Sequence, residues 1–129
     1  MSLLTWSDHQ LHIGIPQLDS AHKAFVTGLH SLAEADRPEF SQLFADFVSH
    51  LEQHFADELQ LMRDSGFSAT SEHHGEHQRI LGELAQLSSR VQDGKIVMAR
   101  AYVLDRLPEW FRLHVTTMDS ALAAHLQKH

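Results

Sequence analysis

Apolar residues recur at every third or fourth position along most of the chain, the spacing that places side chains on one face of an α-helix. Gly and Pro divide this pattern into an arm at 1–18 and helices at about 19–35, 36–65, 70–92 and 96–126. The connections between these helices are short, which favours antiparallel packing of neighbours. We therefore predict an all-α, up-down-up-down antiparallel four-helix bundle with an extended N-terminal arm.

Residues at the expected helix ends support these boundaries. Asp19 or Ser20 can cap the first helix, and Pro38 suits the first turn of the second. Gly66 is expected to end the second helix, and the third can be capped by Ser68, Thr70 or Ser71. Pro108 lies inside the fourth helix, where it removes a backbone hydrogen bond, so we expect a kink or a break into two helices there.

Histidine interrupts the apolar stripe of every predicted helix. The first stripe is His22, Phe25, Val26, Leu29 and Ala33, and the second is Phe44, Phe47, Leu51, His54, Glu58 and Met62. The third is His73, His77, Ile80, Leu84, Leu87 and Val91, and the fourth is Leu104, Leu107, Phe111, His114, Met118 and Leu122. A lone buried His is usually a hydrogen-bonded core residue, but several neutral imidazoles on facing helices cannot satisfy one another in a dry core. A metal ion resolves this, because it takes a lone pair from each ring.

Composition narrows the chemistry that such a core supports. The 129 residues suffice for one domain, so we expect a single domain over 1–129 with the bundle at 19–126. The chain has 12 His and no Cys, and the absence of Cys excludes a disulfide scaffold, a thiolate zinc site and a cysteine-ligated iron–sulfur cluster. The net charge of −7 argues against nucleic-acid binding. No stretch has the pattern of a membrane span or a signal peptide, so we expect no membrane insertion and a cytoplasmic location.

Two pairs of polar residues on these stripes have the spacing of metal ligands. His54 and Glu58 are four residues apart, as are His73 and His77, so each pair projects from one helix face. The stripes with Asp119 supply five His and two carboxylates, which exceed a tetrahedral zinc site and suit two carboxylate-bridged divalent ions, with iron favoured. The Glu-x-x-His motif of ferritin-like di-iron proteins does not occur in the sequence.

The remaining pair, His114 and Asp119, departs from this spacing. Five residues correspond to about 140° around an α-helix, so these side chains cannot project in parallel. Asp119 either straddles the site from another direction or lies on the surface.

Five short segments, spread over almost the whole chain, form a specific pattern. They are LTWSD at 4–8, GIPQLDSAH at 14–22, HFADE at 54–58, GFSATSEHHGEH at 66–77 and WFRLHVTTMD at 110–119. The candidate ligands follow in the order lone His, HxxxE, HxxxH and HxxxxD. In these features the sequence resembles the hemerythrin family, in particular its single-domain bacterial form. It departs from the family pattern at Ala21, where Gln is common, at Ser68, where Pro often stands, and at Pro108.

The resemblance implies a non-haem di-iron centre that binds O2 reversibly. One iron would be held by His73, His77 and His114 and the other by His22 and His54, with Glu58, Asp119 and an oxo or hydroxo group as bridges. O2 would bind as a hydroperoxide at the iron with two His, in an oxygen carrier, store or scavenger rather than an enzyme. The apolar wall around it would be Trp110, Phe111, Val115, Phe25 and Phe55, although plain core packing is the simpler role for these side chains.

Two other functions use the same site and stay open. One is a di-iron enzyme that reduces peroxide or nitric oxide, and the other is an oxygen- or redox-sensing module that acts through a partner. For the leading hypothesis the partner is O2, and we expect a monomer. Among the seven other histidines, His50 is the best further candidate because it lies four residues before His54. An exposed position on the helix flank is its simpler interpretation.

Overall fold

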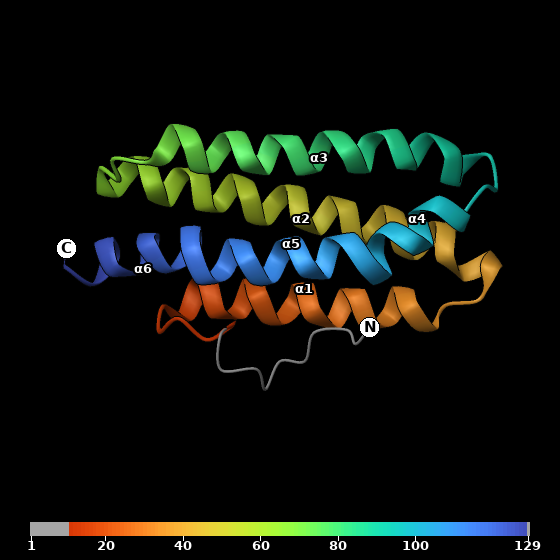
Figure 1. Cartoon of the computed structure of the whole chain (residues 1–129), viewed down its shortest axis with the longest axis horizontal. Coiled ribbons are helices and arrows are strands. Elements are labelled where there is room, and N and C mark those ends of the chain that lie inside the picture. Colours follow the sequence, from red (N-terminus) through yellow and green to blue (C-terminus); the bar gives the residue numbers. More distant parts are fainter. Residues whose placement is uncertain (1–10, 129) are drawn as a thin grey trace.

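The computed structural model of the chain describes residues 11–128. Three long helices are α1 (Pro16–Glu34), α2 (Arg37–Ser65) and α3 (Thr70–Gln92). A fourth helical rod consists of α4 (Val97–Ala101), η2 (Tyr102–Arg106), α5 (Leu107–His114), η3 (Val115–Asp119) and α6 (Ser120–Gln127). The rods lie side by side and alternate in direction (Figure 1). The predicted all-α four-helix bundle is confirmed for the described residues.

Helix α1 begins earlier than the sequence suggests. Pro16 occupies its first turn, where the fixed φ of proline is already helical. Asp19, a predicted cap, lies inside the helix, and its carboxylate accepts hydrogen bonds from the backbone N–H groups of Ile13 (2.8 Å) and Gly14 (3.2 Å). Asp19 therefore fastens the preceding loop to the helix, and the predicted arm is wrong at 16–18, which are helical. Residues 1–10 of that arm lie outside the described residues.

The ends of α2 follow the prediction, whereas the start of α3 does not. Gly66 adopts a φ of 69°, and the N–H of Phe67 donates to the carbonyl of Met62 (3.0 Å), which ends α2. The predicted side-chain caps of α3 are wrong, because Ala69 occupies the cap position and no side chain bonds there. The Thr70 hydroxyl donates instead to the carbonyl of Phe67 at 2.6 Å.

The fourth rod contains two wide turns of π-helix type, in which an N–H bonds the carbonyl five residues earlier. The N–H of Leu107 bonds Tyr102 in η2, and that of Ser120 bonds Val115 after η3. Pro108 lies two residues after the end of η2, and the wider turn gives room to a ring that clashes with the preceding turn of a regular α-helix. The rod bends between α4 and α5 (Figure 1), as the predicted kink requires. The alternative of a break is wrong, because the junction residues keep right-handed helical backbone.

Burial follows the predicted stripe on α3 completely and departs from it on the fourth rod. Val103 is buried where Leu104 was predicted, and Asp119 is buried where Met118 was predicted. Each π turn adds a residue to one turn of helix and so shifts the buried positions. On α1, Leu32 rather than Ala33 is buried. Within residues 11–128, the helices lack the combination of length and apolarity needed to cross a membrane.

Candidate metal centre

Among residues 11–128, six polar side chains lie buried in the apolar core, and all six are ligands predicted from the sequence. None is more than 6% exposed, and together they are His22, Glu58, His73, His77, His114 and Asp119. α1 and α2 supply one each, α3 supplies two and the fourth rod supplies two. The seventh predicted ligand, His54 on α2, is partly exposed. Burial of so many ionisable groups costs free energy unless they are paired or bind a metal.

Five of these side chains converge on one point. Glu58, His73, His77, His114 and Asp119 each offer a ligand atom, and these atoms lie within 4.8 Å of one another. The His73 Nε2 atom is 2.7 Å from Glu58 Oε1 and 3.0 Å from Asp119 Oδ1. His114 Nε2 is 3.2 Å from the same Asp119 oxygen and 3.0 Å from His77 Nε2. The structure thus brings together side chains from three of the four rods.

The directions of these atoms fit a bound cation. Despite the short distances, Glu58 Oε1, His73 Nε2 and Asp119 Oδ1 are buried without a well-aligned hydrogen bond within the described residues. Buried polar atoms are normally satisfied, and lone pairs that meet at a shared point rather than on a donor are arranged as ligands are around a metal. The donor set of imidazole and carboxylate suits iron, manganese or zinc.

The π turn η3 places Asp119 beside His114. Its i→i+5 pattern brings residues five apart to the same side of the helix. The prediction that these two side chains cannot project in parallel is therefore wrong, because it assumed regular α-helical turns. Hydroxyl groups bond carbonyls around this turn: Thr117 Oγ1 donates to Leu113 (2.7 Å) and Ser120 Oγ donates to Val115 (2.8 Å).

His22 approaches the cluster from α1. Its Nδ1 lies 3.1 Å from the carbonyl oxygen of Leu11, which can only accept, so Nδ1 donates there. Its Nε2 lies 2.9 Å from Asp119 Oδ2. A neutral ring with its proton on Nδ1 would point a lone pair at this carboxylate. A second proton or a metal ion is therefore needed between His22 and Asp119.

Burial and neighbouring charges shift the pKa values of the cluster in opposite directions. Burial opposes a charge on His73, but the carboxylates of Asp119 and Glu58 outweigh it and raise the pKa of His73 to about 9. Burial, with repulsion from His114 and His73, lowers the pKa of His77 to about 2. Burial and the charge of Asp119 raise the pKa of Glu58. The pKa of Asp119 is held well below its usual value, because the surrounding imidazoles outweigh its burial.

Comparison with known protein families shows which family has this fold and this set of side chains. Residues 13–126 match the model of the hemerythrin HHE cation binding domain. The chain belongs to the hemerythrin family. A bacteriohemerythrin of Ralstonia nicotianae is 34% identical to it over 126 residues, which are 98% of this chain and 90% of that protein. A myohemerythrin of Riftia pachyptila is 28% identical over 102 residues, which are 79% of this chain and 82% of that protein.

The fold of this hemerythrin-family chain also matches a solved structure. The crystal structure of a hemerythrin mutant superimposes with a TM-score of 0.87 and 21% sequence identity, and the match covers 98% of both chains. The bundle described above is therefore the hemerythrin fold.

A small cavity adjoins the cluster, and all the predicted ligands except His73 line it. Its volume of about 20 Å³ is room for about one water molecule. Four of the five predicted wall residues line it: Phe25, Phe55, Trp110 and Phe111. Val115 is fully buried but does not line it. His54 lines the cavity without joining the convergent five, and burial and the charge of His50 lower its pKa, which keeps the ring neutral.

Aromatic rings fix the ligand orientations in this hemerythrin core. Phe55 stacks on His77 at 3.7 Å between ring centroids, and Trp110 stacks on His114 at 4.6 Å. Glu76 accepts a hydrogen bond from Trp110 Nε1 at 2.7 Å. The role of Glu76, like that of the Leu11 carbonyl, was not predicted from the sequence. The spacing of residues within one helix could not indicate either contact, because each contact joins two different segments of the chain.

Proposed function

We propose that the chain is a di-iron protein that binds O2 reversibly and acts as an oxygen carrier, store or scavenger. The observation that carries the proposal is the convergence of buried imidazole and carboxylate atoms that lack aligned hydrogen bonds. The bacteriohemerythrin and myohemerythrin names of its relatives support the same function. Two bound ferrous ions would supply the electrons with which O2 is held.

Each proposed ligand is assigned to one of the two ions or to a bridge between them. We assign His73, His77 and His114 to one ion and His22 and His54 to the other, with Glu58 and Asp119 as bridges together with an oxo or hydroxo group. Asp119 is suited to bridge, because its Oδ1 faces His73 and His114 while its Oδ2 faces His22. The ion held by two His has the fewer protein ligands, and both of these His line the small cavity, as do His77 and His114.

The walls of the cavity favour binding over catalysis. Apart from the proposed ligands, the described residues that line it are Ala21, Phe25, Leu51, Phe55, Trp110 and Phe111. Their rings and methyl groups exclude water, and no hydroxyl, thiol or amine among them is placed to deliver protons. Such a wall protects the reduced metal centre and lacks the proton donors that an enzyme would need. We therefore propose a binding protein rather than a peroxide- or nitric-oxide-reducing enzyme.

Anaerobic loading of the metal-free chain with Fe2+ tests this function. We expect about two irons per chain and, in air, a charge-transfer absorbance band that disappears on deoxygenation and returns with O2. His73→Gln removes a proposed ligand and is expected to lower the iron content and abolish the band. His74→Gln, at the neighbouring position, is the matched control and is expected to keep both. A chain without a reversible band that turns over peroxide or nitric oxide would contradict the proposal in favour of an enzyme.

Three expectations from the sequence stay predictions. They are the single domain over 1–129, the monomeric state and the cytoplasmic location. Size-exclusion chromatography of the full chain and fractionation of the cells that produce it test the second and third. Limited proteolysis tests the first, because a single cooperative domain resists cleavage between 19 and 126.

A further inference from the structure

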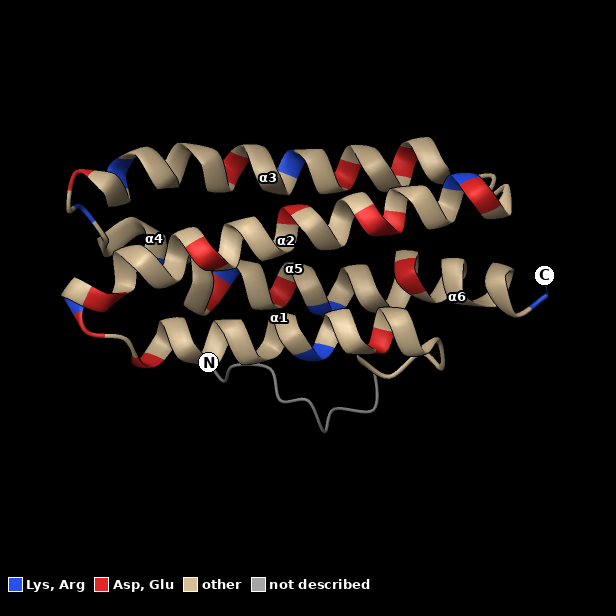
Figure 2. Cartoon of the chain, turned by 180° about the vertical axis from the view of Figure 1, so that it is seen from behind, with Lys and Arg blue, Asp and Glu red and all other residues tan. Residues whose placement is uncertain are grey.

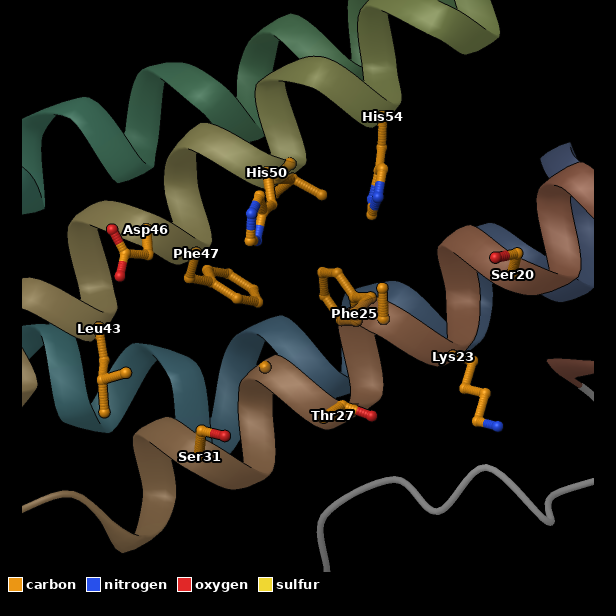
Figure 3. Close-up of a pocket in the computed structure, with 13 residues that line it drawn as sticks. Ser20, Lys23, Phe25, Thr27, Ser31, Leu43, Asp46, Phe47, His50 and His54 are labelled. Atoms are coloured by element: carbon orange, nitrogen blue, oxygen red, sulfur yellow. The ribbon is translucent and has the colours of Figure 1, made fainter.

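A groove on the outside of the bundle leads to the partly exposed ligand His54. It lies between α1 and α2 and has a volume of about 530 Å³, with Phe25, Phe47 and Leu51 among its apolar residues. The rings of Phe25 and Phe47 point toward each other (Figure 3) and lie 5.4 Å apart between centroids. Phe25, Leu51 and His54 also line the small cavity beside the metal cluster. These side chains therefore separate the solvent-open groove from the centre.

His50 stands in this groove one helical turn before His54. Both imidazoles point from α2 toward α1 (Figure 3). Two His four residues apart on a helix can bind one divalent ion, because their side chains project from the same face. Asp46 lies one turn further out and also lines the groove, and Gln42 Nε2 donates to its Oδ1 at 2.9 Å. Three metal-binding side chains thus follow one another along α2 toward the centre.

The charged groups that line the groove are the carboxylate of Asp46 on α2 and the ammonium of Lys23 on α1. Between Arg37 and Ser65, α2 carries six Asp and Glu against two Arg, and the acidic positions recur along the helix in Figure 2. Lys23 on α1 is the one Lys or Arg among the described residues that line the groove. Its ammonium points away from His50 and His54 (Figure 3). Asp46 therefore supplies the negative charge on the α2 side of the groove, where His50 lies, and attracts cations there.

We propose that Asp46 and His50 form a receiving site for ferrous iron, from which the metal passes to His54 and into the centre. The proposal rests on the proposed function, because it explains how that centre is filled. Imidazole and carboxylate are suitable ligands for Fe2+. Because His50 is exposed, an Fe2+ ion bound there can exchange its other ligands with water. Six of the seven proposed ligands are buried, so His54 is the one that incoming metal can reach first. At each step one Fe–ligand bond replaces another, and iron remains Fe2+.

The rate of iron uptake tests the receiving site independently of O2 binding. The metal-free chain is mixed with Fe2+ without oxygen, and the iron still accessible to a coloured ferrous chelator is followed with time. His50→Ala is expected to slow uptake about tenfold while the final iron content per chain equals that of the wild type. His50→Asp keeps a ligand at this position and is expected to restore most of the rate. Asp46→Asn is expected to slow uptake as well.

Asp64→Asn is the matched control for charge. Gln60 donates to Asp64 on the same helix as Gln42 donates to Asp46, but Asp64 lies outside the groove. This variant is expected to load at the wild-type rate. An unchanged rate in His50→Ala, or equal slowing in Asp64→Asn, would overturn the receiving site and leave the proposed function intact. A wild-type chain that takes up no iron would overturn both.

Discussion

His73 and His77 project from the same face of α3, yet their neighbours give them opposite charges in the metal-free protein. His73 Nε2 lies within 3.0 Å of an oxygen of both Glu58 and Asp119, so a proton there is attracted by two carboxylates. His77 Nε2 lies 3.7 Å from Glu58 and faces His114 at 3.0 Å. A proton on His77 would therefore be buried against a second ring. Both residues lie on the same face of α3, so the contacts with other helices determine which imidazole carries a proton.

These shifts predict how the stability of the metal-free protein depends on pH. The pKa of His73 is raised to about 9, so its contribution is present below pH 6.5 and is lost as the pH rises through 9. The pKa of His77 is lowered to about 2, so its contribution is present above pH 6.5 and is lost as the pH falls toward 2. We expect the free energy of unfolding to peak near pH 6.5 and to fall by about 3 kcal/mol by pH 9.

Urea unfolding of the metal-free chain at several pH values measures this profile. His73→Gln is expected to remove most of the loss on the alkaline side, leaving the part due to His22, whose pKa Asp119 raises despite burial. His74→Gln is expected to keep the whole loss. A metal-free protein that becomes more stable between pH 7 and 9 would show that the carboxylates do not hold a proton on His73. With iron bound the alkaline loss is expected to disappear, because coordination requires the deprotonated ring.

At the scale of the element, the fourth rod shows how a π turn changes which residues lie on the same face of a helix. In a regular α-helix the residue four after His114 shares its face, which is why Met118 was predicted to be buried. The π turn η3 moves this position to Asp119. Thr116 and Thr117, exposed on the outside of the turn, donate hydroxyl hydrogen bonds to carbonyls one turn earlier. The turn therefore supplies a carboxylate ligand at a position that α-helical periodicity assigns to an apolar side chain.

Two variants of this turn distinguish π from α geometry. Deletion of Thr117 leaves His114 and the aspartate four residues apart in a regular helix, so we expect iron binding to be kept. The exchange Met118→Asp with Asp119→Met places the carboxylate where only a regular α-helix would aim it, so we expect iron binding to be lost. Metal analysis after anaerobic loading measures both, and circular dichroism checks that the helix content is unchanged. Iron binding by the exchange variant would contradict the π geometry of the loaded protein.

On the scale of the whole molecule, the proposed centre joins all four rods. His22 comes from α1, Glu58 from α2, His73 and His77 from α3, and the last two ligands from the fourth rod. Without a cation, the core holds buried carboxylate oxygens and ring nitrogens that lack aligned partners, which costs free energy. A bound metal removes this cost only in the folded state, so metal binding and folding are coupled.

Removal of the metal is therefore expected to destabilise the entire bundle. At a free iron concentration about 1,000 times Kd, binding adds about 4 kcal/mol to the free energy of unfolding, which corresponds to a rise in Tm of about 10 °C or more. Calorimetry of the iron-loaded and the chelator-treated chain, both without oxygen, measures this difference. His73→Gln, which lacks one ligand, is expected to show a smaller rise. Equal Tm values with and without iron in the wild type would contradict a centre shared by four helices.

Much of the fold and of the proposed ligand set follows from local spacing. The stripe on α3 is buried at all six predicted positions, and Gly66 ends α2 as predicted. Five of the six buried polar residues of the described chain were predicted from their places on apolar stripes, whereas Asp119 lay off the predicted stripe and was assigned as a ligand through the resemblance to the hemerythrin family. Such features depend on residues that are near one another in the chain, because helical periodicity places them on a common face. The helix caps were less predictable: Asp19 and Thr70 can bond in several ways, and only the packed loop selects one.

The sequence by itself determined the number of helices, their inward faces and the types of side chain available to a metal. Only the tertiary structure decided that Asp119 lies beside His114, that Glu76 holds Trp110 over the same ring, and that His50 shares a groove with His54. The physical reason is the range of the interactions involved. Periodicity is set within a few turns of one helix, whereas a π turn and a contact between helices depend on how neighbouring rods are rotated and packed.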